Sequence, residues 1–262
     1  MIIAAIALAL VAVALFIVGR VMAGKAVLIA GTEKVAASEL GADAKAVSSE
    51  IGAGSFAKYV EVAGTVSCDS PLEAEFTGTK CVHYETKVVR EYEESYVETS
   101  SDGSSRTQTR RGTENVSSNS RSCAFTLDDG SGKIEVDPAG AEFHLETTMS
   151  RFEPGEGART IGSYVLNAVL AGSGGRRTIG YRFEEKCFPV GRQGYVFGEA
   201  GDAGGALRIR KGAERGKRLI VSLKSGEELL RSARLGATWL TVGACVALAA
   251  AAILIVLGAL RR

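Results

Sequence analysis

A histidine and a glutamate at the spacing used by zinc-dependent deaminases are the residues of this chain most suggestive of catalysis. His83-Tyr84-Glu85 has the His-x-Glu order in which the histidine would ligate zinc and the glutamate would move protons. That chemistry also needs a Pro-Cys-x-x-Cys motif, and none follows. Alternation along a β-strand explains the pair better. Because His144 is the only other histidine, we expect no histidine-based metal or acid–base site.

Two further motifs could bind a ligand, and each has a simpler interpretation. Residues Gly52 to Ala57 match the G-x-G-x-x-A fingerprint of dinucleotide sites, but they follow a helical pattern and precede a strand, which reverses the required order. Asp128-Asp129-Gly130 lacks the later ligands of a calcium loop and is typical of a hairpin turn. We therefore predict no catalytic residue, no metal ligand and no cofactor.

The cysteines leave the redox compartment open. Cys68, Cys81, Cys123 and Cys187 form an even set that permits two disulfides and three pairings in an oxidising compartment. Four isolated thiols in a reducing cytoplasm are equally ordinary.

Two uncharged apolar runs, Ile2–Gly19 and Ala237–Leu260, must position everything between them. A run of roughly 20 apolar residues matches the hydrocarbon thickness of a bilayer when it is helical. We predict transmembrane helices over 1–20 and 237–260. The first run lacks a positive N-terminal flank and has a poor cleavage context at Ala23, so we expect an uncleaved signal anchor rather than a cleaved signal peptide.

Positive charge near the anchors weakly favours a cytoplasmic central domain. The charges are Arg20, Lys25 and Lys34 after the first anchor, Lys224, Arg231 and Arg234 before the second, and Arg261 and Arg262. Long loops translocate largely regardless of charge, so the side stays open. Gly243, Ala247 and Ala251 recur every four residues, which would allow a homo-oligomer through the second anchor.

The segment between the anchors, 32–234, is predicted to be one β-rich domain. Its patterns indicate short helices over Thr32–Ile51 and Ile161–Leu170, a capped helix start at Ser225, and many short strands. Such strands favour an antiparallel barrel or sandwich, mainly β and α+β overall. Residues 98–120 hold hardly an apolar side chain, so we predict a flexible loop.

The strand candidates are listed together because their order matters below. They are Tyr59–Val62, Cys81–Val89, Ala124–Leu127, Lys133–Val136, Phe143–Leu145, Tyr181–Cys187, Gly194–Gly198, Ala206–Ile209 and Leu219–Leu223.

The order of several short motifs resembles the GIDE domain, also called the "beside a membrane" domain. The motifs are Tyr59–Val66, Pro71-Leu72, Cys81–Tyr84, Phe125–Asp129, Val136–Ala141, Val196–Ala200, Leu207–Arg210 and Ile220–Ser225. Each motif alone is unspecific, but their order and the two flanking anchors resemble the family over roughly Thr32 to Arg234.

The resemblance implies a membrane domain of organelle-membrane ubiquitin ligases, in which a zinc-binding RING follows the second anchor. RING chemistry needs paired cysteine and histidine ligands. Here the sequence stops at Arg262 and no two cysteines lie within three residues of each other. We therefore expect no ligase activity, and the chain resembles the RING-less prokaryotic members.

Two functions are compatible with these features. The first is a two-pass membrane protein whose domain binds a protein or lipid beside the bilayer without catalysis. The second is a component of a ubiquitin-ligase-like or hydrolytic membrane complex whose active site another chain supplies. The charges, Lys+Arg 31 against Asp+Glu 30, give no basic field, so we expect no nucleic acid partner.

Overall fold

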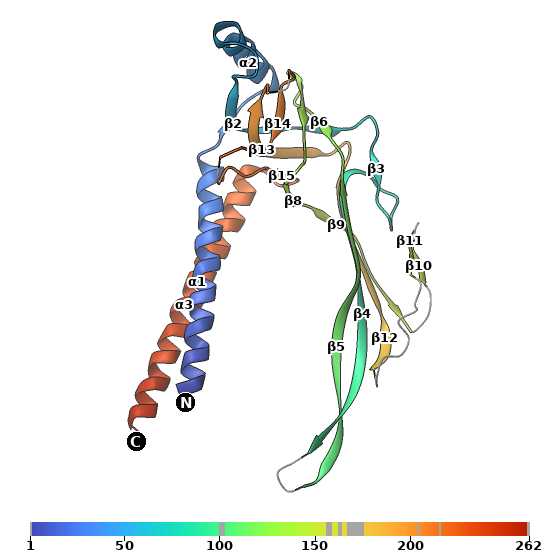
Figure 1. Cartoon of the computed structure of the whole chain (residues 1–262), viewed down its shortest axis with the longest axis vertical. Coiled ribbons are helices and arrows are strands. Elements are labelled where there is room, and N and C mark those ends of the chain that lie inside the picture. Colours follow the sequence, from blue (N-terminus) through green and yellow to red (C-terminus); the bar gives the residue numbers. More distant parts are fainter. Residues whose placement is uncertain are drawn as a thin grey trace.

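The computed structural model shows two long helices beside a group of β-strands (Figure 1). It describes residues 2–99, 103–155, 159–161, 164–166, 176–203, 205–214 and 216–260. Helices α1 (Ile2–Ala30) and α3 (Gly226–Leu260) lie side by side, with both chain termini at the helix ends opposite to those that join the strands. Both are long and apolar enough to cross a membrane. The predicted mainly β fold with two flanking apolar helices is confirmed.

Five strands close into a small barrel. They are β2 (Ala57–Ser67), β6 (Phe125–Asp128), β7 (Lys133–Val136), β14 (Arg208–Arg210) and β13 (Gln193–Gly201). The ring closes because β13 pairs with β14 and also with β2. Strand β2 alternates as the sequence predicts, burying Val60, Val62 and Val66 toward the interior. Gly64 is required there, because a Cβ would lie 2.8 Å from the carbonyl of Asp128.

Three short strands extend the barrel by pairing outside the ring. Strand β1 (Glu33–Lys34) pairs with β2, β15 (Ile220–Ser222) pairs with β13, and β8 (Glu142–His144) pairs with β15. Among the described strands, most ladders are antiparallel as predicted, while β1–β2, β7–β14 and β8–β15 are parallel.

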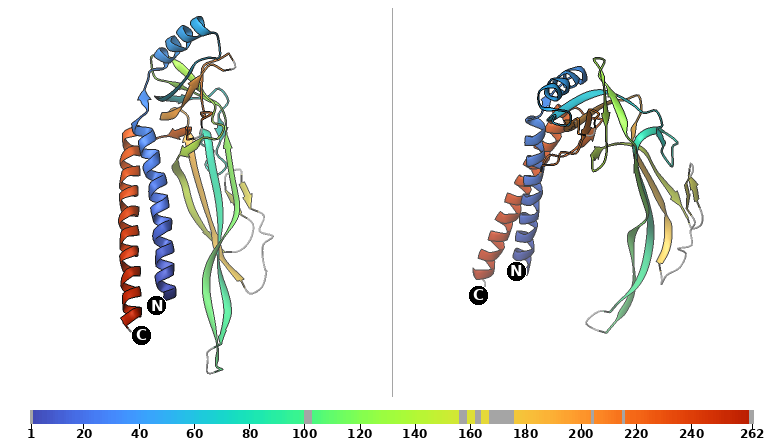
Figure 2. Two further views of the ribbon diagram at one scale, coloured as in Figure 1. Left: turned by 60° about the vertical axis from the view of Figure 1, so that its left-hand side comes forward. Right: turned by 45° about the horizontal axis from the view of Figure 1, so that its top comes forward.

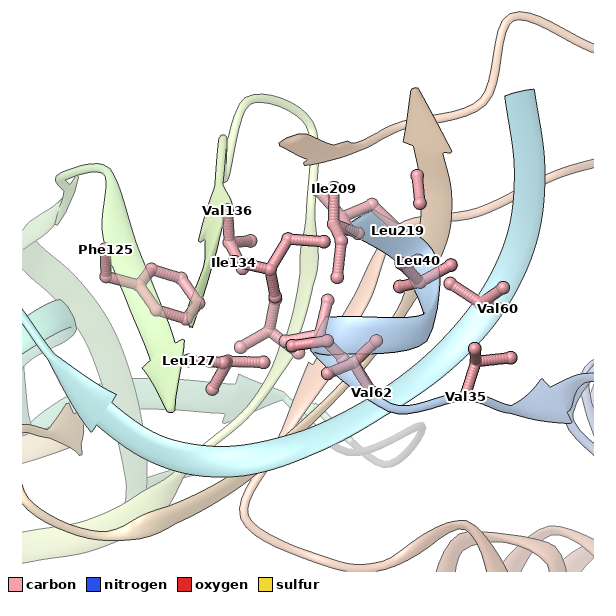
Figure 3. Close-up of a cluster of buried hydrophobic side chains, with 14 of the residues drawn as sticks. Val35, Leu40, Val60, Val62, Phe125, Leu127, Ile134, Val136, Ile209 and Leu219 are labelled. Atoms are coloured by element: carbon pink, nitrogen blue, oxygen red, sulfur yellow. The ribbon is translucent and has the colours of Figure 1, made fainter. Parts of the chain in front are cut away.

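The short helix α2 (Ala37–Ile51) packs onto the barrel core. It buries Ala37, Leu40 and Ala44, a spacing that places all three on one helical face. Figure 3 shows Leu40 directed into the cluster formed by Val60, Ile209 and its neighbours. The helix predicted within Thr32–Ile51 is therefore present, and it runs through Gly41 without a break.

A second sheet is inserted into the barrel chain at two places. It contains β3 (Leu72–Glu73), β4 (Lys80–Thr99), β5 (Ser105–Ser122), β9 (Glu146–Pro154) and β12 (Arg176–Pro189). The order is β3-β4-β12-β9, and β5 pairs with β4. Figures 1 and 2 show that β4 and β5 form a long hairpin directed away from the barrel.

The prediction of a flexible loop over 98–120 is wrong for the part that forms β5. The ladder between β4 and β5 runs from His83–Ser122 to Thr99–Ser105. Backbone pairing needs no apolar side chain, and the polar residues of β5 stay largely exposed at the edge of the sheet. Low apolar content therefore misled the prediction.

A second prediction also fails in part. The piece Ile161–Leu170 was expected to be helical, but β10 (Arg159–Ile161) and β11 (Tyr164–Leu166) form a small antiparallel hairpin. The rest of that piece lies outside the described residues. The capped start at Ser225 is confirmed, because Ser225 Oγ accepts a hydrogen bond from Glu228 N and Glu228 Oε2 accepts one from Ser225 N.

Candidate interaction surface beside the membrane helices

Helices α1 and α3 pack antiparallel in a register that aligns their uncharged segments. A Cβ at Gly19 would lie 3.5 Å from Leu240 Cβ, and one at Gly243 would lie 3.6 Å from Leu15 Cδ1. The part of α1 from Ile2 to Gly19 therefore runs beside the part of α3 that begins near Leu240. These 18 residues span about 27 Å, close to the hydrocarbon thickness of a bilayer.

Small residues line the contact between the two helices. Ala12 of α1 and Ala244 and Ala251 of α3 are buried, while large apolar side chains such as Phe16 and Ile253 are exposed. Small residues allow close backbone approach in membranes, and exposed apolar ones suit lipid. Part of the small-residue stripe predicted on α3 is thus used within the chain.

Between the uncharged segments and the barrel, the two helices form a charged stalk. We use this name for residues 20–30 of α1 and 226–236 of α3. The α3 part carries Glu227, Glu228, Arg231 and Arg234, which are costly in hydrocarbon. Eleven helical residues make the stalk about 16 Å long.

The stalk is fixed to the barrel by an apolar cluster. Ile29 of α1 and Leu229 of α3 are buried together with Phe197 and Ile220 of the barrel strands. At the opposite end of the stalk, Trp239 is exposed at the start of the uncharged segment, where membrane-interface indoles usually lie.

The β4–β5 hairpin carries paired charges on both of its faces. Glu94 lies 2.7 Å from Arg110 and 3.1 Å from Arg176, and its pKa is lowered by hydrogen bonds from these two guanidinium groups. Glu94 of β4 and its two arginines, Arg110 of β5 and Arg176 of β12, therefore form a charged triad that crosses three strands.

Glu93, on the opposite face, repeats the arrangement. It lies 3.0 Å from Arg177 and 3.1 Å from Arg111, and hydrogen bonds from these groups lower its pKa. Because successive strand residues point to opposite faces, neither face at this level is apolar.

The Tyr92 ring packs against two guanidinium groups in the same part of the hairpin. Tyr92 faces Gly112 across the ladder, and a Cβ at Gly112 would lie 2.6 Å from the Tyr92 ring. The guanidinium of Arg176 lies 4.8 Å from the ring centroid and that of Arg90 lies 5.7 Å from it. Arg90 is buried, and its Nε donates to Thr178 Oγ1 at 2.9 Å.

Beyond the stack, the hairpin presents exposed residues to solvent. Tyr96 is 40% exposed and Val97 is 65% exposed, which makes them the large apolar side chains at the distal part of β4. Strand β5 pairs only with β4 among the described strands, so its outer edge offers backbone N–H and C=O groups.

His83 and Glu85 of the His-x-Glu motif are two residues apart in β4, so their side chains lie on the same face of the strand. His83 is buried and stacked on Phe143 at a centroid distance of 3.7 Å, and its Nδ1 lies 2.8 Å from Ser122 Oγ. Its Nε2 is 3.5 Å from Glu85 Oε1. Burial lowers the pKa of His83. Among the described residues, no group of three or more His, Cys, Asp or Glu side chains is placed to hold a metal ion.

The other two motifs are structural connections. Gly52–Ala57 links α2 to β2, in the helix-then-strand order expected of a linker. Asp202 Oδ atoms accept hydrogen bonds from Gly54 N and Phe56 N at 3.0 Å and from Ser48 Oγ at 2.8 Å. The Gly54 bond is the largest cause of the lowered pKa of Asp202.

Asp129, in the predicted hairpin turn, holds α2 onto the barrel. Its Oδ2 accepts a 2.7 Å hydrogen bond from Ala37 N, and its Oδ1 accepts bonds from Ser131 and Gly132. Burial alone would raise the pKa of Asp129, but these hydrogen bonds together lower it. The turn that could have suggested calcium therefore holds the N-terminal end of a helix.

Two of the cysteines lie together and two are in a separate cluster. Cys68 and Cys123 have Sγ atoms 3.7 Å apart. Cys81 and Cys187 are buried in one cluster of the second sheet, and burial raises the pKa of Cys81 to about 12. Cys245 is exposed on α3.

Sequence reasoning missed one buried acidic residue that organises the second sheet. Glu185 is fully buried in β12, and its carboxylate accepts hydrogen bonds from Phe76, Thr77 and Thr148. No local signal marks it, since all these partners are far away in the sequence.

Comparison with known families shows a match to this chain. The model of the GIDE family, described as "E3 Ubiquitin ligase", matches residues 94–258, more than half of the chain. The matched part begins in the hairpin and ends in α3. No curated protein and no solved structure matches the chain.

Proposed function

Because the chain belongs to the GIDE family, we propose that it is a two-pass membrane protein whose β-domain binds a protein partner beside the bilayer without catalysis of its own. Two apolar helices in register support the membrane part of the proposal. The β4–β5 hairpin, with its exposed distal residues and open β5 edge, is the observation that carries the binding part.

The hairpin suits an extended protein segment. An open strand edge can accept another strand through main-chain hydrogen bonds, and side chains beside it then select the partner. Here the edge is 18 residues long, and Tyr96 and Val97 supply apolar contacts near its distal end. Double anchoring restricts the orientation of the domain and raises its effective concentration for other membrane proteins.

A lipid headgroup is the less favoured occupant. Binding to anionic lipid needs uncompensated Lys or Arg side chains. On the hairpin, Arg110 and Arg111 are paired with Glu94 and Glu93. The surface is therefore nearly neutral where a basic patch would be needed.

The direction of the hairpin places a constraint on the membrane-bound protein. In Figures 1 and 2 the hairpin extends from the barrel toward the same end as the chain termini. Its 20-residue strand β4 is about 65 Å long, whereas the stalk spans about 16 Å. Since its charged faces are excluded from hydrocarbon, we propose that the hairpin turns outward along the membrane surface when the helices insert.

A second candidate function follows from the family description. The chain would be a non-catalytic component of a ubiquitin-ligase-like or hydrolytic membrane complex, with the active site on another chain. The description "E3 Ubiquitin ligase" is the observation that favours it. The identity of the bound partner separates the two candidates.

The test is photo-crosslinking in intact membranes. A benzophenone amino acid would replace Val97 at the hairpin, and Ile51 of α2, which is 70% exposed, would be the matched control position. We expect a discrete protein adduct from position 97 and none from position 51. Adducts to lipid alone, or equal adducts at both positions, would contradict the proposal. A captured RING protein or hydrolase would favour the second candidate.

A further inference from the structure

A cysteine stands at each end of the β3–β5 insertion, where the chain leaves the barrel after β2 and returns to it before β6. Cys68 directly follows β2, and Cys123 lies between β5 and β6. Strands β2 and β6 are paired beside them, with Ser67 opposite Thr126. Cys123 N donates to Val82 O at 2.9 Å, which holds the second cysteine in place. The two cysteines therefore lie at the neck of the β3–β5 insertion, by which we mean the place where its two ends join the barrel.

The two thiols are close together and open to small molecules. Their Sγ atoms are 3.7 Å apart, whereas a disulfide bond is about 2.05 Å long, so a small side-chain movement suffices. Both line a cavity of about 420 Å³, together with Asp69, Ser70 and Glu135. Cys81 and Cys187, in contrast, are fully buried.

We propose that Cys68 and Cys123 form a redox-active dithiol that closes into an intramolecular disulfide at the neck of the hairpin insertion. The oxidant is a small disulfide such as oxidised glutathione. One protein thiolate attacks it and releases a glutathione thiolate, which takes up a proton. The second protein thiol loses its proton and attacks the mixed disulfide, which releases the second glutathione. Two protein thiols are oxidised and one glutathione disulfide is reduced to two thiols.

The environment of the pair orders these steps. Burial, followed by the hydrogen bond that its thiol donates to Cys68 Sγ, raises the pKa of Cys123 to about 11. A protonated thiol is a poor nucleophile, so the first attack belongs to Cys68. The closed disulfide would tie the base of the hairpin to the barrel, which is the only place where β3, β4 and β5 connect to β2 and β6 along the chain.

The experiment uses the full chain in lipid nanodiscs and glutathione buffers of increasing oxidised fraction. Samples are quenched with acid, denatured and labelled with a maleimide, and intact masses and linked peptides are measured. We expect two of the five cysteines to lose their labels together, with a peptide that joins Cys68 to Cys123. The Cys68→Ser and Cys123→Ser chains should lose this step.

Cys81→Ala and Cys245→Ala are matched controls that keep the neck pair. Each should still lose two labels at the same glutathione ratio as the unmodified chain. Five labelled cysteines at every ratio would overturn the proposal. Glutathione adducts without the linked peptide, or a peptide joining Cys81 to Cys187, would also overturn it.

Discussion

Glu185 and Phe76, which are 109 residues apart in the sequence, are joined by a 2.6 Å hydrogen bond from the Phe76 backbone N–H to the Glu185 carboxylate. The same carboxylate accepts bonds from Thr77 Oγ1 at 2.5 Å and from Thr148 Oγ1 at 3.0 Å. One buried side chain of β12 thus connects the β3–β4 loop and strand β9.

Replacing Glu185 with leucine should destabilise the domain by about 2–4 kcal/mol, because several buried donors would lose their acceptor. Thermal or chemical unfolding in detergent measures the change. Glu184→Gln, at the neighbouring and partly exposed position, is the control and should stay within about 0.5 kcal/mol of the unmodified chain. Equal losses in both variants would show that the Glu185 bonds contribute little.

Asp202 should make the stability of the connection between α2 and β2 depend on pH in the acid range. The pKa of Asp202 is lowered in the folded state, chiefly by the hydrogen bond from Gly54, so its contribution is present above the unfolded value of about 4. That contribution is lost as the pH falls through the lowered pKa. Asp202→Asn should therefore lower the Tm at pH 7, and the difference should shrink in acid. Asp69→Asn, on an exposed loop, is the control. A Tm difference between Asp202→Asn and the unmodified chain that stays constant as the pH falls would contradict this role of Asp202.

A side chain at position 112 should weaken the hairpin locally, because Gly112 packs against the Tyr92 ring. Gly112→Val would displace the Tyr92 ring and separate it from Arg176, with a loss of about 1 kcal/mol in local opening. Hydrogen exchange of the amides in β4 measures this opening. Thr113→Val is the control, because it places the same valine side chain on the opposite face of β5 with little change in volume. Protection that falls equally in both variants would argue against the stack.

The outward turn of the hairpin is open to a depth measurement. A spin-labelled amino acid at position 97 should remain accessible to a water-soluble relaxation agent when the chain is in a bilayer. The same label at Ile17, an exposed apolar position of α1, should be accessible to dissolved oxygen instead. A position-97 label that resides in hydrocarbon would contradict the exclusion of the charged faces.

Self-association through α3 stays a prediction with a modified interface. Because Ala244 and Ala251 are buried in the chain, a second copy must use another face, on which Cys245 is exposed. Oxidative crosslinking in membranes should then give a dimer that Cys245→Ala abolishes. A strictly monomeric band in the unmodified chain would oppose the prediction.

Strands with alternating apolar residues could be predicted from the sequence. Strands that depend on hydrogen bonds from a neighbouring strand could not. The Asp128-Asp129-Gly130 turn and the strands on either side follow from local pattern, and both are present. Strand β5 exists because β4 supplies its hydrogen bonds, and no property of its own residues indicates this. The helix predicted near Ile161 fails for a similar reason, since a short apolar run suits either a helix or a hairpin.

The candidate surface shows the same division. The two uncharged helices can be predicted from composition alone, because a helix in lipid satisfies its backbone hydrogen bonds within its own segment. The roles of Glu185 and Asp202 depend on donors more than 100 residues away in the chain. The residues next to Glu185 and Asp202 in the sequence do not indicate these distant donors.

The stalk has a consequence for how the barrel responds to its lipid surroundings. At physiological ionic strength the potential of a charged headgroup layer decays over about 8 Å. The headgroup region occupies roughly 5–8 Å of the stalk's length of about 16 Å, so the barrel lies about one decay length from that layer. Anionic lipid content should therefore have only a small effect on the ionisation of barrel groups such as Asp129 and Asp202.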